Sequence, residues 1–289
     1  MVKFIYAAYS KCGTKTIAHV FKKLGYRVYD QEEFYIYTLN FWKIFNDQNN
    51  SVEEKQKAIY DMLKNTDVVT DMPFYLYWKE ILDVFPNAKV IFYERPEDEW
   101  FISLCHTMDI LANSTMRGFL HKYFLYFFCP TVYKGQSATW NDFSVQFTGL
   151  RFNNHLQFKN WRGEIIKVSE IHAKRAYRQH CSDVKMHCPK ENLIHFDTLN
   201  FGNYENFCHE IGIDGDSENL SKHQKDIYNS CKDLEWPVIN KNSELIKRAL
   251  EMKYEDSVLR DIVKSEIKNN FLIYASCFVI VIVFGYAIL

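Results

Sequence analysis

The sequence predicts an α/β fold in which a parallel β-sheet lies between two layers of helices. Short apolar segments alternate with helical patterns of about 10–15 residues, which is typical of βαβ units. The chain has 289 residues, of which 47% are hydrophobic, so it can bury the core of one α/β domain with appendages, or of two small domains. The first unit, residues 4–24, shows the pattern most clearly.

Residues 4–9 are apolar or aromatic and predict a buried strand. A helix follows, because apolar residues recur at the spacing of one helix face, at Ile17, Val20, Phe21 and Leu24. Gly25 stands where a helix C-terminus favours a left-handed residue.

The turn between this strand and helix, SKCGTKT, predicts an anion site. Gly13 permits a close backbone approach, and the first N–H groups of the helix, from about Thr14, have no intrahelical acceptor. Lys11 and Lys15 add positive charge. An ordinary strand–helix turn is the alternative. A triphosphate-binding GxxxxGK[ST] loop does not fit, because Ala8, Thr14 and Lys15 stand at its defining positions.

The later elements continue the alternation. Ser51 and Glu54 form a capping box that opens a helix, and Pro96 with three acidic residues after it opens another. We predict strands at 26–30, 68–72, 89–94 and 192–197, and helices at 34–45, 51–63, 74–85, 164–187, 204–213 and 243–270.

Residues 116–133 are dense in aromatic side chains but are interrupted by Pro130. They predict a buried helical cap near 110–165. A wall of an acceptor pocket, or a surface that dips into a bilayer, are the alternatives.

Residues 271–289 form a 19-residue stretch without a charge. A membrane-spanning helix needs about 20 apolar residues, so we predict a tail anchor rather than a buried core helix. Lys264 and Lys268 precede it, which places the bulk of a single-pass protein on the cytosolic side. The domains are then an α/β domain at 1–242, a charged helical linker at 243–270 and the anchor.

Composition restricts the partners. The 35 basic and 36 acidic residues nearly balance, whereas nucleic-acid binding usually needs a basic excess. The eight cysteines show no regular framework and indicate reduced, mostly buried thiols.

A second anion-binding segment is YERPEDEWFISL, in which Arg95 ends a predicted strand and Ser103 lies two turns into the next helix. A guanidinium can give paired hydrogen bonds to a phosphate, and a hydroxyl can add one more. A surface or capping arginine is the alternative.

Together these segments resemble the sulfotransferases. The turn is similar to their YPKSGTT loop, and Arg95 with Ser103 to their R-N-P-x-D-x-x-x-S motif, although the Asn is missing. Residues 85–100, FPNAKVIFYERPEDEW, with the D-M-P at 71–73, resemble the divergent family 4 branch. The likeness covers about residues 3–240 and implies the P-loop NTPase-like sulfotransferase fold.

The resemblance implies transfer of a sulfuryl group from 3′-phosphoadenosine 5′-phosphosulfate (PAPS) to a hydroxyl or amine of a small acceptor, without a metal ion. The aromatic cap and the predicted anchor indicate a hydrophobic acceptor. Lys11 would stabilise the leaving oxygen, and Arg95 and Ser103 would bind the 3′-phosphate. The 5′-phosphosulfate would lie against Lys11, Cys12, Gly13, Thr14, Lys15 and Thr16.

The sequence leaves two candidates for the catalytic base. Asp71 stands where the cytosolic enzymes have a histidine, and the alternative is that it structures the loop before Pro73. His106, one turn beyond Ser103, is a second candidate base, or a structural histidine.

Some residues depart from the family pattern. Ile17 replaces the tryptophan that stacks on adenine, Cys12 and Lys15 replace hydroxyl residues, and the late R-K-G-x-x-G motif is missing. A catalytically inactive, membrane-bound binding module is therefore the alternative function. A nucleotide kinase or GTPase-like protein is a third interpretation.

Overall fold

The computed structural model describes residues 1–30, 49–112, 169–213, 222–237, 264–265 and 267–270. The predicted helix at 34–45, the predicted anchor at 271–289, most of the cap near 110–165 and most of the linker at 243–270 lie outside the described residues. None of the helices described is long and apolar enough to cross a membrane.

The core of the protein is a parallel five-stranded sheet, ordered β2-β3-β1-β4-β5. In the register of the central strand, Phe4 pairs with Val68 on one side and with Lys89 on the other. The strands are β1 (Phe4–Tyr6), β2 (Val28–Tyr29), β3 (Val68–Val69), β4 (Lys89–Tyr93) and β5 (Leu193–Phe196).

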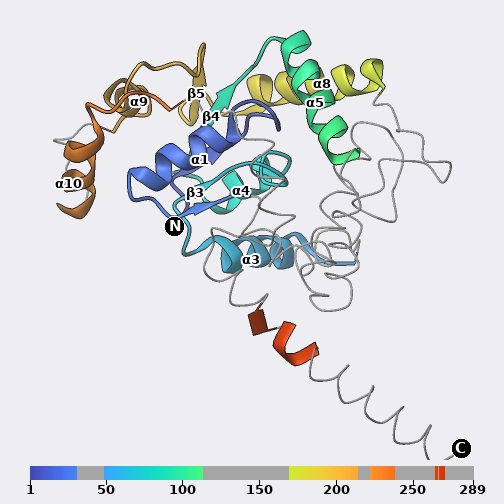
Figure 1. Ribbon diagram of the computed structural model, residues 1–289. Helices are drawn as coiled ribbons and strands as arrows, with labels where there is room; N and C mark the ends of the chain where they lie inside the picture. Colours follow the sequence, from blue (N-terminus) through green and yellow to red (C-terminus); the bar gives the residue numbers. More distant parts are fainter. Residues whose placement is uncertain (31–48, 113–168, 214–221, 238–263, 266, 271–289) are drawn as a thin grey trace, which may run out of the picture.

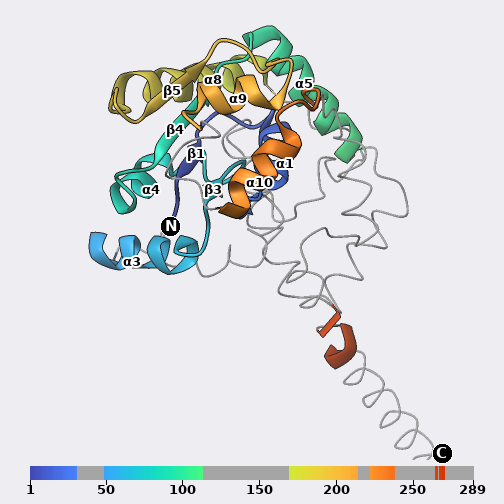
Figure 2. The same ribbon diagram turned by 90° about the vertical axis from the view of Figure 1, so that its left-hand side faces the viewer.

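Helices cover both sides of this sheet, as Figures 1 and 2 show. On one side lie α1 (Thr14–Lys23), α9 (Tyr204–Glu210) and α10 (Lys222–Cys231), and on the other α3 (Val52–Leu63), α4 (Trp78–Val84) and α8 (Glu170–His187). The Phe21 ring lies 5.1 Å from that of Phe4 in β1 and 5.4 Å from that of Phe207 in α9. The predicted α/β fold with a parallel sheet between helices is confirmed.

The order of the strands places the site. After β1 the chain moves to one side of it for β2 and β3, and then to the other side for β4 and β5. Open α/β sheets bind ligands outside the carboxyl ends of the strands at such a switch point. The segments after β1, β2, β3 and β4 therefore meet at one edge of the sheet.

Local signals set several boundaries as predicted. Helix α1 begins at Thr14, the capping box of Ser51 and Glu54 opens α3, and Gly25 adopts a left-handed conformation with φ 77°. The helix after Pro96 is α5 (Glu97–Ala112).

Other predicted boundaries are shorter in the structure. Strand β1 ends at Tyr6 and β3 at Val69. The loops that follow them contain left-handed backbone, at Lys11 (φ 74°) and Asp71 (φ 64°). Helix α4 begins at Trp78 rather than at residue 74, since a turn with a hydrogen bond from Leu76 N to Pro73 O comes first.

Candidate functional site

The loop between β1 and α1 forms the base of the site. Gly13, with φ 77°, is the N-cap of α1, and the first turn of that helix contains no acidic residue. A methyl group at Gly13 would come within 2.2 Å of the Leu199 Cδ1 atom on a backbone with left-handed φ, so both the space and the backbone favour glycine. The N-terminus of α1 carries the positive end of the helix dipole, and no carboxylate in the first turn of the helix offsets it. This end of the helix therefore favours an anion.

Three side-chain donors hold the carbonyl groups of this loop. The Trp100 indole donates to Ser10 O at 2.9 Å, and the Tyr6 hydroxyl donates to Cys12 O at 2.5 Å. The third donor is Arg95, which reaches Lys11 O at 3.3 Å. These bonds fix the path of the backbone, and satisfied buried carbonyls stabilise the folded loop.

Arg95 brings the two predicted segments together. Besides its bond to Lys11 O, its guanidinium lies 3.6 Å from the Glu99 carboxylate, and its side chain is 31% exposed. The arginine after β4 and the lysine after β1 therefore lie in one site, as the hypothesis of a shared anion requires.

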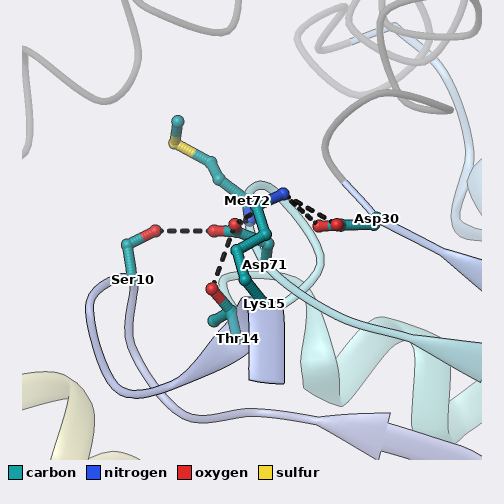
Figure 3. Close-up of polar contacts among 6 residues, drawn as sticks. All are labelled: Ser10, Thr14, Lys15, Asp30, Asp71 and Met72. Carbon is teal, nitrogen blue, oxygen red and sulfur yellow. Dashed lines mark hydrogen bonds and ion pairs between the residues drawn. The ribbon is translucent and has the colours of Figure 1, made fainter. Parts of the chain in front are cut away.

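Asp71 is the centre of a buried polar cluster (Figure 3). Its carboxylate accepts bonds from Ser10 Oγ at 2.9 Å, Thr14 Oγ1 at 3.1 Å and its neighbour Met72 N at 2.9 Å. Lys15 Nζ lies 3.5 Å away. Burial alone would raise the pKa of Asp71, but Lys15 and these donors hold that pKa below its ordinary value.

The ammonium group of Lys15 is paired with carboxylates of the protein itself. Its ammonium group binds both oxygens of Asp30, at 2.8 and 2.7 Å, in addition to its contact with Asp71. Its charge is thus compensated by two buried carboxylates within the protein. Any contact of Lys15 with a ligand would come chiefly from its backbone N–H.

Lys11 is the more responsive cation. Burial lowers the pKa of its ammonium group to about 8, with the charge of Asp71 opposing and those of Lys15 and Arg95 adding to the effect. Its side chain is therefore charged at neutral pH but loses that charge readily as the pH rises, and a bound anion would restore it.

The other predicted residues are placed as follows. The backbone N–H of Cys12 donates to Tyr9 O at 3.1 Å, so this N–H is already bonded within the loop. Burial raises the pKa of the Cys12 thiol to about 11. Thr16 is buried in α1. Ser103 and His106 both lie further along α5, half-buried and exposed respectively.

Several side chains of the site were not singled out from the sequence. Asp30 directly follows β2 and could have been found from its place at the carboxyl edge of a strand. Trp100 is the last residue of the segment 85–100, which carries the family resemblance, but no role was predicted for it. Tyr177, whose hydroxyl donates to Arg95 O at 2.7 Å, gave no signal, because it lies 82 residues further along the chain.

Within the described residues, no group of three or more His, Cys, Asp or Glu side chains could hold a metal ion. Beside the carboxylate of Asp71, three groups that suit an anion converge here: the α1 N-terminus, Lys11 and Arg95.

The comparisons agree with this geometry. A family model described as a sulfotransferase domain matches residues 3–255. A search of curated proteins found no match. The resemblance drawn from the loop and from residues 85–100 is confirmed, and the chain belongs to the sulfotransferase family, in its family 4 branch.

Proposed function

We propose that this chain is a membrane-anchored sulfotransferase that transfers a sulfuryl group from PAPS to a hydroxyl or amine of a small, hydrophobic acceptor. The observation that supports it best is the hydrogen bond from Arg95 Nη1 to Lys11 O. It joins a site for a 5′-phosphosulfate, at the α1 N-terminus, to a guanidinium suited to a 3′-phosphate.

The reaction asks little covalent chemistry of the protein. The sulfur–oxygen bond to the donor phosphate breaks while one forms to the acceptor oxygen or nitrogen, whose proton leaves. In this proposal the backbone from Gly13 to Thr16 orients the donor, and Lys11 compensates the charge that develops on the departing phosphate. Arg95 and Ser103 hold the other phosphate.

Asp71 and His106 stay candidate bases. The bonds that Asp71 accepts from Ser10, Thr14 and Met72 N support the alternative that Asp71 structures the loop before Pro73. A carboxylate whose pKa is held low is a weak proton acceptor, so we propose that Asp71 chiefly organises the loop.

A catalytically inactive binding module is the second candidate. Ile17, at the position of the family's adenine-stacking tryptophan, is fully buried in the core, and Lys15 is neutralised by Asp30 and Asp71. Both features reduce the contacts that a donor could make.

Transfer of label separates these functions. The full-length protein in detergent is incubated with PAPS labelled in its sulfate group and a panel of hydroxyl and amine acceptors, with Lys11→Ala as control. Labelled product from the wild type alone supports the enzyme. Binding of 3′-phosphoadenosine 5′-phosphate (PAP) without transfer supports the binding module, and tighter binding of ATP than of PAP would contradict both.

The membrane anchor at 271–289 is a proposal from the sequence. Its 19 uncharged residues follow Lys264 and Lys268, which favours a span with the enzyme domain on the cytosolic side. The truncated chain 1–270 should move to the soluble fraction, while the full chain should need detergent for extraction. Equal partitioning of the two forms would show that these residues do not anchor the protein.

A further inference from the structure

Two stacked aromatic side chains lie against the anion-binding segments. The rings of Trp100 in α5 and Tyr177 in α8 have centroids 4.3 Å apart and an interplanar angle of 14°. Both side chains are almost completely buried, at 0% and 1% exposure. Close packing on all sides leaves such a pair little freedom to shift.

Each ring of this stack binds the backbone of a different segment. The indole of Trp100 donates to Ser10 O, in the loop after β1, at 2.9 Å. The hydroxyl of Tyr177 donates to Arg95 O, after β4, at 2.7 Å, and lies 3.8 Å from Cys12 Sγ. A single rigid unit therefore connects the two segments that converge on the site.

The helices that carry the stack are held together independently. Lys174 of α8 pairs with Asp98 of α5, and Arg178 of α8 pairs with Glu97 of α5 at 2.6 Å. On the sheet side, the His180 ring of α8 lies 2.7 Å from Ala7 O, just after β1. The stack is thus fixed relative to the sheet as well as to the loop.

We propose that Trp100 and Tyr177 act as positioning residues whose stack sets the separation between the two phosphate-binding segments. They thereby select a nucleoside that carries phosphate groups on both its 3′ and 5′ positions. This rests on the proposed function. A ligand that contacts both segments depends on their separation, whereas 5′-AMP, which contacts the loop alone, does not.

The test compares PAP with 5′-AMP by calorimetric titration of the full-length protein in detergent. Tyr177→Phe keeps the stacked ring and removes the hydroxyl that holds Arg95 O, so the Arg95 segment is held less firmly in place for the second phosphate. PAP should bind about tenfold more weakly, the net contribution of about one hydrogen bond. Binding of 5′-AMP, which in this proposal does not contact the Arg95 segment, should change by less than about twofold, well below the contribution of one hydrogen bond. Trp100→Phe keeps a ring but removes the indole donor to Ser10 O, in the loop that both ligands contact. It should therefore weaken 5′-AMP as well, but PAP by more, because the separation of the two segments also changes.

Tyr26→Phe is the matched control, because Tyr26 is a buried tyrosine that packs on Phe4 and Phe21, away from the site. It should leave both affinities unchanged. An unchanged PAP to 5′-AMP ratio in the folded variants, or an equal loss for both ligands, would overturn the positioning role. Failure of the wild type itself to prefer PAP would instead overturn the proposed function, and the positioning role with it.

Discussion

At the scale of single residues, Lys11 and Lys15 lie four positions apart but have different electrostatic environments. Lys15 is bound to Asp30 and is part of the protein's own charge balance. Lys11 is desolvated, and its pKa falls to about 8. The cation that can respond to a ligand is therefore Lys11.

This difference predicts a pH dependence of binding. Lys11 is charged below about pH 8 and neutral above it, so PAP affinity should fall by up to about tenfold from pH 7 to pH 9 as that charge is lost. Lys11→Arg should bind PAP with little change over the same window, because a guanidinium stays charged. Isothermal titration at several pH values measures both, and an equal decline in the variant would show that another group is responsible.

Asp71 gives a second test at this scale. Asp71→Asn removes one of the two carboxylates that pair with Lys15 and weakens the bonds from Ser10 and Thr14, so the free energy of unfolding should fall by about 1–3 kcal/mol. If Asp71 is mainly a catalytic base, the variant should instead keep its stability and its PAP affinity while losing turnover. Urea denaturation beside the transfer assay distinguishes the two.

At the scale of elements, the loop between β1 and α1 depends on a glycine in contact with the segment after β5. Gly13 has a left-handed φ, and the Leu199 side chain lies where a Cβ atom at this position would be. Gly212 has a similar φ of 72° but nothing within 4 Å. The two glycines separate backbone strain from steric overlap.

Gly212→Ala should therefore destabilise the protein by about 1–2 kcal/mol, the cost of a left-handed alanine. Gly13→Ala should cost about 1–3 kcal/mol more, because the overlap with Leu199 is added, and Leu199→Ala should recover part of that difference. Equal stabilities of the two single variants in urea denaturation would show that Leu199 yields without cost.

Helices with local signals were predictable, and strand ends were not. Periodicity and capping residues are contained in a short window, so α1 and α3 could be read at Thr14 and Ser51. The loops after β1 and β3 contain left-handed backbone at Lys11 and Asp71, a conformation that is uncommon in residues other than glycine. Sequence patterns alone do not encode that.

For the site, residues within the two motifs could be predicted, and those that support them could not. Lys11, Gly13 and Arg95 follow from the loop and strand-end patterns, and the structure brings them together. The pairing of Lys15 with Asp30 and the bond from Tyr177 to Arg95 O join residues 15 and 82 positions apart. Such contacts arise only once the sheet has assembled.

At the scale of the whole molecule, the strand order makes the site. The chain turns from one side of β1 to the other, which sets the loop after β1 beside the arginine after β4. Two weak cationic patterns, each common in unrelated folds, thereby lie in one site, which we propose binds the two phosphate groups of one ligand. We propose that both segments must converge for a doubly phosphorylated ligand to bind.

Binding of PAP and of 5′-AMP to the wild type, Lys11→Ala and Arg95→Ala tests this claim most directly. We expect Lys11→Ala to weaken both ligands, since both contact the loop. Arg95→Ala should reduce the affinity for PAP to nearly that for 5′-AMP, because the second phosphate loses its charge-assisted bonds. A preference for PAP that survives Arg95→Ala unchanged would contradict the account.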